Sequence, residues 1–266
     1  GEIKMGEKVT GRFKSTYINN FSNNLPYGGY SPVNPMQSLG SWFGRQVDME
    51  YLQENWREMD PFGKPVTWSY YYHDSPYWTV HRKPTTRNRD RIFGNAEIQY
   101  NVLDWLNLTA RIGTDLFNEF RKHRVWNMSN ENKTQGGQFW QNKRKNQETN
   151  IDFIASFDKQ INPDIRIDGV LGGNYRRYDY DYSLIQASEL TVPNFFHISN
   201  VSGSPTTDMF KQELEMNSVF GQANFSYKDY IFIGGTARND WSSTLPSDNW
   251  SYFYPSVNFG LIFTEL

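Results

Sequence analysis

A short run near the end of the chain gathers several hydrogen-bonding groups: Arg238, Asn239, Asp240, Trp241, Ser242 and Ser243. A guanidinium and a carboxylate can form two parallel hydrogen bonds, and the hydroxyls add further donors and acceptors. Two interpretations follow. The groups can tie a rim loop to its neighbours, or they can contact a polar solute. We favour the structural network, because an apolar alternating segment leads directly into Ala237.

Aromatic side chains crowd the segment from Tyr51 to Trp78. Aromatic rings offer large, rigid faces with polar edges, which suit contact with sugar rings or peptide side chains. The candidates for such contact are Tyr70, Tyr71, Tyr72, Tyr77 and Trp78. The alternative interpretation is that these rings pack the segment against its neighbours.

Other chemistry-bearing patterns are missing from the sequence. The chain has no cysteine, and its four histidines, His73, His81, His123 and His197, are scattered and have no acidic or histidine neighbours at ligand spacing. It has no glycine-rich phosphate loop and no nucleophile beside a recognisable base. We therefore expect no catalytic residue, no metal site and no cofactor, and we predict that the protein is not an enzyme.

Composition narrows the class of protein. The 266 residues carry 27 basic and 29 acidic side chains, so nucleic acid is not an expected partner. Mean hydropathy is −0.75, and no apolar run approaches the roughly 18 residues that a membrane helix needs. Membrane-spanning strands need an apolar residue only at every second position. The polar start, Gly1 to Thr10, lacks the apolar core of a signal peptide, which predicts a processed product or a fragment.

Alternation with a period of two is the main structural signal. Between Ile92 and Val102 the even positions are mostly apolar and the odd ones mostly polar, and the pattern resumes from Leu106 to Leu116. A hairpin with Val102 opposite Leu106 puts both apolar sets on one face. The further facing pairs are then Tyr100 with Leu108, Ile98 with Ala110, and Ala96 with Ile112.

The same pattern recurs along the chain. Hairpins are predicted around Pro163 and Asp229, with a first strand near Glu7 to Ile18 and a last one from Phe253. About eight strands result, most of them longer than the roughly five or six residues usual in soluble sheets and long enough to cross a membrane. Long connections (19–90, 121–145 and 179–211) alternate with short ones. This predicts an all-β, antiparallel transmembrane barrel with long extracellular loops. A soluble β-sandwich is the alternative.

Three sequence segments carry a family resemblance. They are Gly234-Gly-Thr-Ala-Arg-Asn-Asp-Trp-Ser-Ser-Thr-Leu-Pro246 with Tyr252-Phe-Tyr-Pro-Ser-Val257, Ser75-Pro-Tyr-Trp78 leading into Asn88-Arg-Asp-Arg-Ile-Phe-Gly-Asn95, and Val192-Pro-Asn-Phe-Phe-His-Ile-Ser-Asn200. The chain resembles SusC/RagA-like TonB-dependent outer-membrane transporters over roughly Ser75 to Leu266. The first 70 residues match that family only loosely.

The resemblance implies a function and a location. Such transporters import oligosaccharides or peptides across the outer membrane of Gram-negative bacteria through a barrel of about 22 strands around an N-terminal plug. A SusD-like surface lipoprotein covers the mouth, and TonB supplies energy. Residues 1–266 would then be a partial TonB-dependent receptor β-barrel domain, about eight strands without plug, signal peptide or C-terminal strands. Its partners would be this lipoprotein, TonB through the parent's N-terminal region, outer-membrane lipid and a glycan or peptide solute.

Two other functions stay open at this point. A soluble extracellular glycan-binding β-domain could use the aromatic segment. A passive porin would fit the alternation of the strands, but not the Arg238–Ser243 motif.

Overall fold

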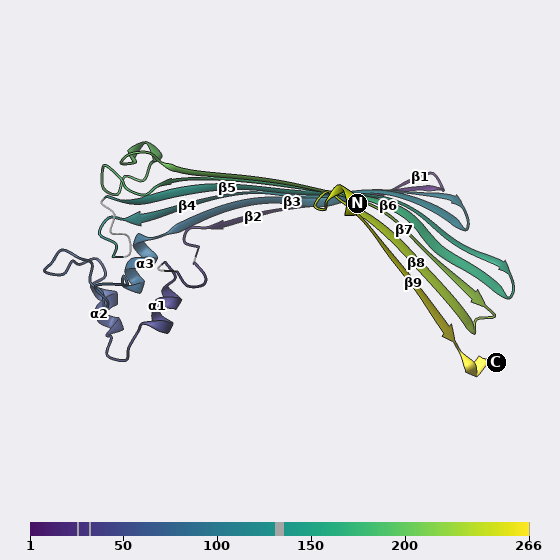
Figure 1. The fold of residues 1–266 in the computed structure, drawn as a ribbon, viewed down its shortest axis with the longest axis horizontal. Coiled ribbons are helices and arrows are strands. Elements are labelled where there is room, and N and C mark those ends of the chain that lie inside the picture. The colour runs from purple at the N-terminus through teal and green to yellow at the C-terminus, as the bar shows by residue number, and fades with distance from the viewer. Residues whose placement is uncertain (26, 32, 131–135, 266) are drawn as a thin grey trace.

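An antiparallel sheet runs along most of the chain in a computed structural model, with strand neighbours in sequence order (Figure 1). The structure describes residues 1–25, 27–31, 33–130 and 136–265. The strands found there are β1 (Glu2–Met5), β2 (Val9–Ser22), β3 (Thr85–Leu103), β4 (Leu106–Trp126), β5 (Gly137–Asn162), β6 (Ile165–Ala187), β7 (Thr206–Tyr227), β8 (Ile231–Ser242) and β9 (Ser251–Leu261). The helices are α1 (Pro35–Ser41), α2 (Met49–Glu54) and α3 (Pro76–Arg82), with 3-10 turns at Ile198–Asn200, Ser247–Asn249 and Phe263–Glu265.

The sheet confirms the predicted all-β antiparallel fold. Among the described residues it has one strand more than the roughly eight expected, the short β1, which pairs with β2. Strands β3 to β7 are between 19 and 26 residues long, about twice what a membrane crossing needs. The expected long connections 121–145 and 179–211 are therefore partly strand. Backbone hydrogen bonds hold a ladder together even where side chains on both faces are polar, so loss of alternation did not mark the strand ends.

The hairpin registers follow the apolar pattern. Tyr100 faces Leu108, Ile98 faces Ala110 and Ala96 faces Ile112, as predicted. The expected pairing of Val102 with Leu106 is wrong by one residue, because Leu103 takes that place across a two-residue turn and a bulge absorbs the difference. At the β7–β8 turn, Lys228 and Asp229 both have positive φ, as tight hairpin turns require.

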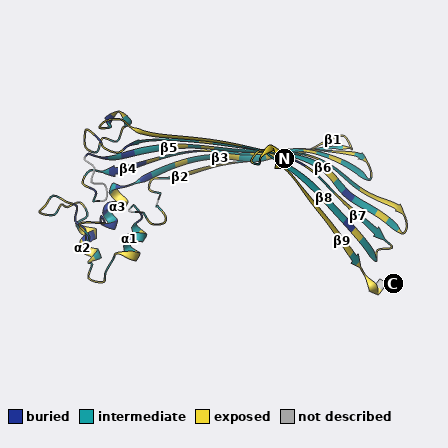
Figure 2. Ribbon diagram, in the orientation of Figure 1, coloured by how far each residue is buried: buried dark blue, intermediate teal, exposed yellow. Residues whose placement is uncertain are grey.

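Toward the short-turn end, one face of the sheet is apolar and uncovered. On it, Ile98, Phe153 and Leu171 are 55%, 64% and 61% exposed, and no second sheet packs against them in the part of the chain that the structure describes. Buried residues gather instead near the helices and the adjoining strand ends (Figure 2). A soluble sandwich would bury this face between two sheets, so the fold lacks the feature that defines that alternative.

The helices belong to the long connection 23–84, here called the helical insert. Asn34 and Asp48 cap α1 and α2 by accepting from the backbone N–H groups of Met36 and Tyr51, and prolines open α1 and α3. The insert lies at the long-loop end, on the side toward which the sheet curves (Figure 1). None of the helices within the described residues is long and apolar enough to span a membrane.

Candidate functional site

The concave face of the sheet carries a ladder of ion pairs, here called the polar wall. Its pairs are Arg12–Glu97 at 2.9 Å, Arg111–Asp152 at 2.8 Å, Arg176–Glu148 at 3.0 Å, and Arg91–Asp115. Their partners lie on adjacent strands, and the side chains are partly exposed. Each pair contributes about 0–1 kcal/mol to stability. The wall is thus charged but close to neutral, a surface suited to water and polar solutes.

Toward the long-loop end the polar wall becomes buried. Glu119 is 2% exposed and lies between Arg89 at 2.7 Å and Arg121 at 2.6 Å. Two guanidinium groups compensate the cost of burying this carboxylate. The cluster was not predicted from the sequence, because it lies where the strands were expected to leave the sheet. The alternation of Arg87, Arg89 and Arg91 with polar residues was the signal that could have revealed it.

The Arg238–Ser243 motif lies mostly within β8, and only Ser243 follows the strand. The expectation of a rim loop is corrected accordingly. Arg238 donates to Asp240 Oδ1 at 2.7 Å and to Ser218 Oγ at 2.9 Å, and its guanidinium lies 5.5 Å from the Phe220 ring. Ser218 is 3% exposed, so this arginine joins β7 to β8 on the polar wall.

The rest of the motif makes contacts of the same kind. Ser243 exchanges two hydrogen bonds with the backbone of Glu215, at 2.8 and 2.9 Å. Asn239 and Ser251 join β8 to β9 through their side chains. Asn239 and Trp241 alternate with Arg238 and Asp240, so the motif is divided between the two faces. These contacts within the chain favour the structural interpretation over solute contact.

Replacing Arg238 by alanine should lower the free energy of unfolding by about 1–2 kcal/mol, because a partly exposed ion pair and a hydrogen bond to buried Ser218 are lost. Solute uptake per folded molecule should stay unchanged. Urea unfolding of the full-length protein in liposomes and an uptake assay measure both quantities, with Asn239→Ala as the matched control. A raised KM with unchanged stability would assign Arg238 to solute binding instead.

The aromatic candidates divide into surface and interior. Tyr70, Tyr71 and Tyr72 are 43%, 83% and 70% exposed, and the Tyr72 ring stacks with Trp42 at 6.4 Å. Trp78 is only 3% exposed, and its indole N–H donates to Ser129 Oγ at 2.9 Å. The expectation that Trp78 contacts solute is therefore corrected: α3 turns its side chain toward the strand ends, where it packs.

A buried polar cluster holds the helical insert together. Lys83 and Asp74 form an ion pair at 2.6 Å with both side chains fully buried, and Asp74 also accepts from the backbone N–H of Asn130 at 2.8 Å. Burial of the His73 side chain, together with the charge of Lys83, lowers the pKa of His73. This imidazole is therefore neutral at neutral pH. The guanidinium of Arg82 lies 3.9 Å from the Trp126 ring at the end of β4.

Among the described residues, no group of three or more histidine, cysteine, aspartate and glutamate side chains is arranged to hold a metal ion. The candidate site consists of the polar wall, the exposed side chains of Tyr70, Tyr71 and Tyr72, and the helical insert that carries these tyrosines.

No protein-family model matches the chain. Among curated proteins, TonB-dependent receptor P26 of Formosa agariphila is 26% identical over 113 residues, which cover 41% of this chain and 11% of that protein. The structure of the RagAB peptide transporter matches with a TM-score of 0.77 and 16% identity, over 96% of this chain and 28% of that one. The RagAB peptide importer in its open-open state gives 0.72 and 17%, with the same coverage.

These comparisons bear out the resemblance to TonB-dependent receptors and the all-β barrel fold. The chain spans only a small part of each protein that it matches.

Proposed function

We propose that residues 1–266 are part of the barrel domain of a SusC/RagA-like TonB-dependent transporter, which imports oligosaccharides or peptides across the outer membrane of a Gram-negative bacterium. One observation carries the proposal: a single layer of long antiparallel strands has an uncovered apolar convex face and a concave face lined with ion pairs. A membrane barrel has its apolar face outside and its polar face inside, the reverse of a soluble protein, because lipid surrounds it and water fills it.

The orientation follows from the cost of placing charges in hydrocarbon. The convex rows through Ile98, Phe153 and Ile233 face lipid, and the row through Arg111 and Asp152 faces the lumen. The opposite arrangement would put several ion pairs into the bilayer, at several kcal/mol for each uncompensated charge. In the complete barrel, further strands would pair with the edges of β1 and β9, because lipid cannot satisfy open backbone groups.

The helical insert would narrow the mouth of the lumen from its extracellular side. Its exposed Tyr70, Tyr71 and Tyr72 offer ring faces to a sugar or peptide, or to a SusD-like lipoprotein covering the mouth. TonB would act on the parent protein through its N-terminal region.

Uptake in cells tests the function. A strain lacking the encoding gene should lose uptake of one class of labelled oligosaccharide or peptide, and the full-length gene should restore it. Restoration should fail in a strain without TonB. Continued uptake without TonB would assign the protein to passive porins, and unchanged uptake in the deletion strain would overturn the proposed import.

Surface labelling of the full-length protein tests the direction of the strands. A tag inserted at Gly203, in the exposed connection between β6 and β7, should be labelled on intact cells, whereas a tag at Asp229 should be labelled only after the outer membrane is opened. Gly203 is chosen over Gly136, since a side chain at Gly136 would collide with the Leu190 backbone. Labelling of Asp229 alone on intact cells would reverse the assigned direction.

A further inference from the structure

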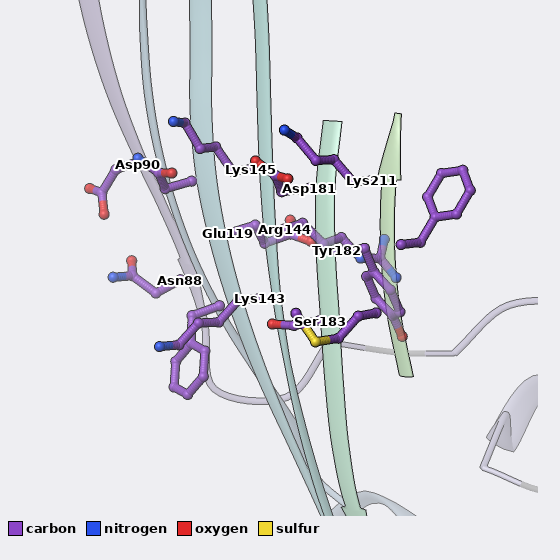
Figure 3. A pocket seen from close by; sticks show the side chains of 14 residues that line it. Asn88, Asp90, Glu119, Lys143, Arg144, Lys145, Asp181, Tyr182, Ser183 and Lys211 are labelled. Carbon is purple, nitrogen blue, oxygen red and sulfur yellow. The ribbon is translucent and has the colours of Figure 1, made fainter. Parts of the chain in front are cut away.

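Toward the long-loop end, the concave face becomes rich in arginine. Two neighbouring rows of the register, here called the arginine rows, cross β3, β4, β5 and β6 on the same face as the polar wall. The outer row contains Arg87, Arg121, Asn142 and Leu184, and the inner row contains Arg89, Glu119, Arg144 and Tyr182. Figure 3 shows Glu119, Arg144 and Tyr182 on neighbouring strands.

The arginine rows lie above the lipid-facing belt. On the convex face of β3 and β4 the belt ends at Ile92 and Leu116, and the next convex side chains outward are Asp90 and Asn118. The inner arginine row begins one residue further out, at Arg89. The rows therefore line the outer part of the lumen, which a solute meets before it reaches the membrane-spanning part of the wall.

The chain neutralises only two of the four guanidinium groups. Glu119 pairs with Arg89 and Arg121. Among the described residues, neither Arg87 nor Arg144 has a carboxylate within 4 Å, and the Nε atom of each is buried without a hydrogen-bond partner. Buried donors in folded proteins are nearly always hydrogen-bonded. The unused donors of Arg87 and Arg144 therefore indicate a ligand that carries acceptors.

The surroundings of these two arginines leave a positive charge. Arg87 donates to the neutral amide oxygen of Asn20, and the guanidinium carbon of Arg144 lies 5.5 Å from the centre of the Tyr182 ring. Along the described rows the next carboxylate is Asp208 on β7, two strands from Arg144 and thus about 10 Å away across the sheet. The ligand is therefore expected to be an anion.

Tyr27 of the helical insert closes the outer side of the arginine rows. Its ring meets the His123 ring edge-on, with 5.4 Å between the centroids. Burial raises the pKa of Tyr27, and the positive charges of Arg121 and Arg144 oppose this rise. The phenol hydroxyl thus lies near both arginines, where it can donate a further hydrogen bond to a bound anion.

The neighbouring side chains favour a sugar over a peptide. Tyr178, Tyr180 and Tyr182 alternate along the lumen side of β6, and lead from the arginine rows toward the belt. Their ring faces and polar tips suit sugar rings and hydroxyls. Peptide main chains are often recognised by the open edge of a strand, but β3 to β7 are paired on both sides in this sheet.

We propose that the imported solute is an acidic oligosaccharide and that one of its carboxylate or sulfate groups binds Arg87 and Arg144. Planar guanidinium groups form paired hydrogen bonds with such oxyanions. The adjoining sugar rings lie along the three tyrosines of β6, and Glu119 holds the other two arginines in place. This inference names a substrate class for the proposed function and rests on it, because it requires the concave face to line the lumen.

Calorimetric titration of the full-length protein in detergent micelles tests the proposal. The charged probes are oligogalacturonate, alginate and sulfated carrageenan hexasaccharides, and maltohexaose and cellohexaose are the neutral ones. At least one charged probe should bind, and both neutral probes should bind at least about 10-fold more weakly. Arg87→Gln/Arg144→Gln should weaken binding of the charged probe by about 10- to 100-fold, because charge-assisted hydrogen bonds are lost.

The matched control is Lys143→Gln/Lys145→Gln, which removes two exposed charges on either side of Arg144 but from the convex face. It should bind like the wild type. The single variant Arg144→Gln removes no ion pair and should melt at the wild-type temperature while it still binds the charged probe more weakly, which separates binding from folding.

Several results would overturn the proposal. They are equal binding of the charged probe by wild type and arginine variant, an equal loss in the lysine variant, tighter binding of a neutral hexasaccharide or of hexaglutamate, and no binding of any charged oligosaccharide. A preference among the charged probes identifies the anion as carboxylate or sulfate. Unchanged uptake in the deletion strain would instead refute the proposed import, with the binding result left intact.

Discussion

Replacing Ile98 by arginine in the full-length protein should lower the free energy of unfolding by about 2–4 kcal/mol, the cost of a charge facing the middle of the bilayer. Ile98 is 55% exposed on the convex face, in one row with Ala110 and Phe153. Its side chain meets lipid there, and no carboxylate of the polar wall can reach through the sheet to compensate an arginine. Urea unfolding from liposomes measures the change.

The matched control is Gln99→Arg, one residue along the strand and on the polar wall. It should cost less than about 1 kcal/mol, because water surrounds the new charge and the only bond lost to Arg12 is a long one, at 3.4 Å to Gln99 Oε1. Equal costs at positions 98 and 99 would contradict the assignment of the faces.

A second control uses a polarity-sensitive dye on a cysteine at each of the two positions. Lipid-soluble quenchers should dim the dye at position 98 and leave the dye at position 99 bright. The reverse pattern would mean that the convex face is not the lipid-facing one.

Replacing Asp74 by alanine should open the helical insert while the sheet stays folded. The change breaks the buried ion pair between Asp74 and Lys83 and removes the acceptor for the Asn130 N–H. Breaking a buried ion pair in this way costs about 3–5 kcal/mol. Hydrogen exchange of the α3 amides should therefore accelerate by roughly two to four orders of magnitude, with the β3–β7 amides unchanged.

Two comparisons make the Asp74 result specific. Asp60→Ala removes acceptors from an exposed turn, where Asp60 Oδ1 binds the Phe62 and Lys64 N–H groups, and should cost only about 1 kcal/mol. The double variant Asp74→Leu/Lys83→Met should recover most of the lost protection, because it removes both charges. Unchanged exchange of α3 in Asp74→Ala would show that the pair does not hold the insert.

The hairpins were predictable because their information is local. A strand with one apolar face repeats every two residues, and a short turn allows only one register that keeps the apolar sets together. The pairs Ile98–Ala110 and Ala96–Ile112 follow from this rule. The Gly234–Pro246 run was equally informative about the family, although its part from Arg238 to Ser243 was expected in a rim loop and lies almost entirely in β8.

The sequence by itself determined the alternation, the hairpin registers near the short turns and the all-β class, because each depends on neighbouring residues. Only the tertiary structure decided where the strands end, that Trp78 is buried, and that Asp74 meets Lys83 inside the insert. It also brought Lys145 into line with Asp181 and Lys211. The physical reason is that burial and charge pairing depend on residues far apart in the chain, which become neighbours only once several strands are in register.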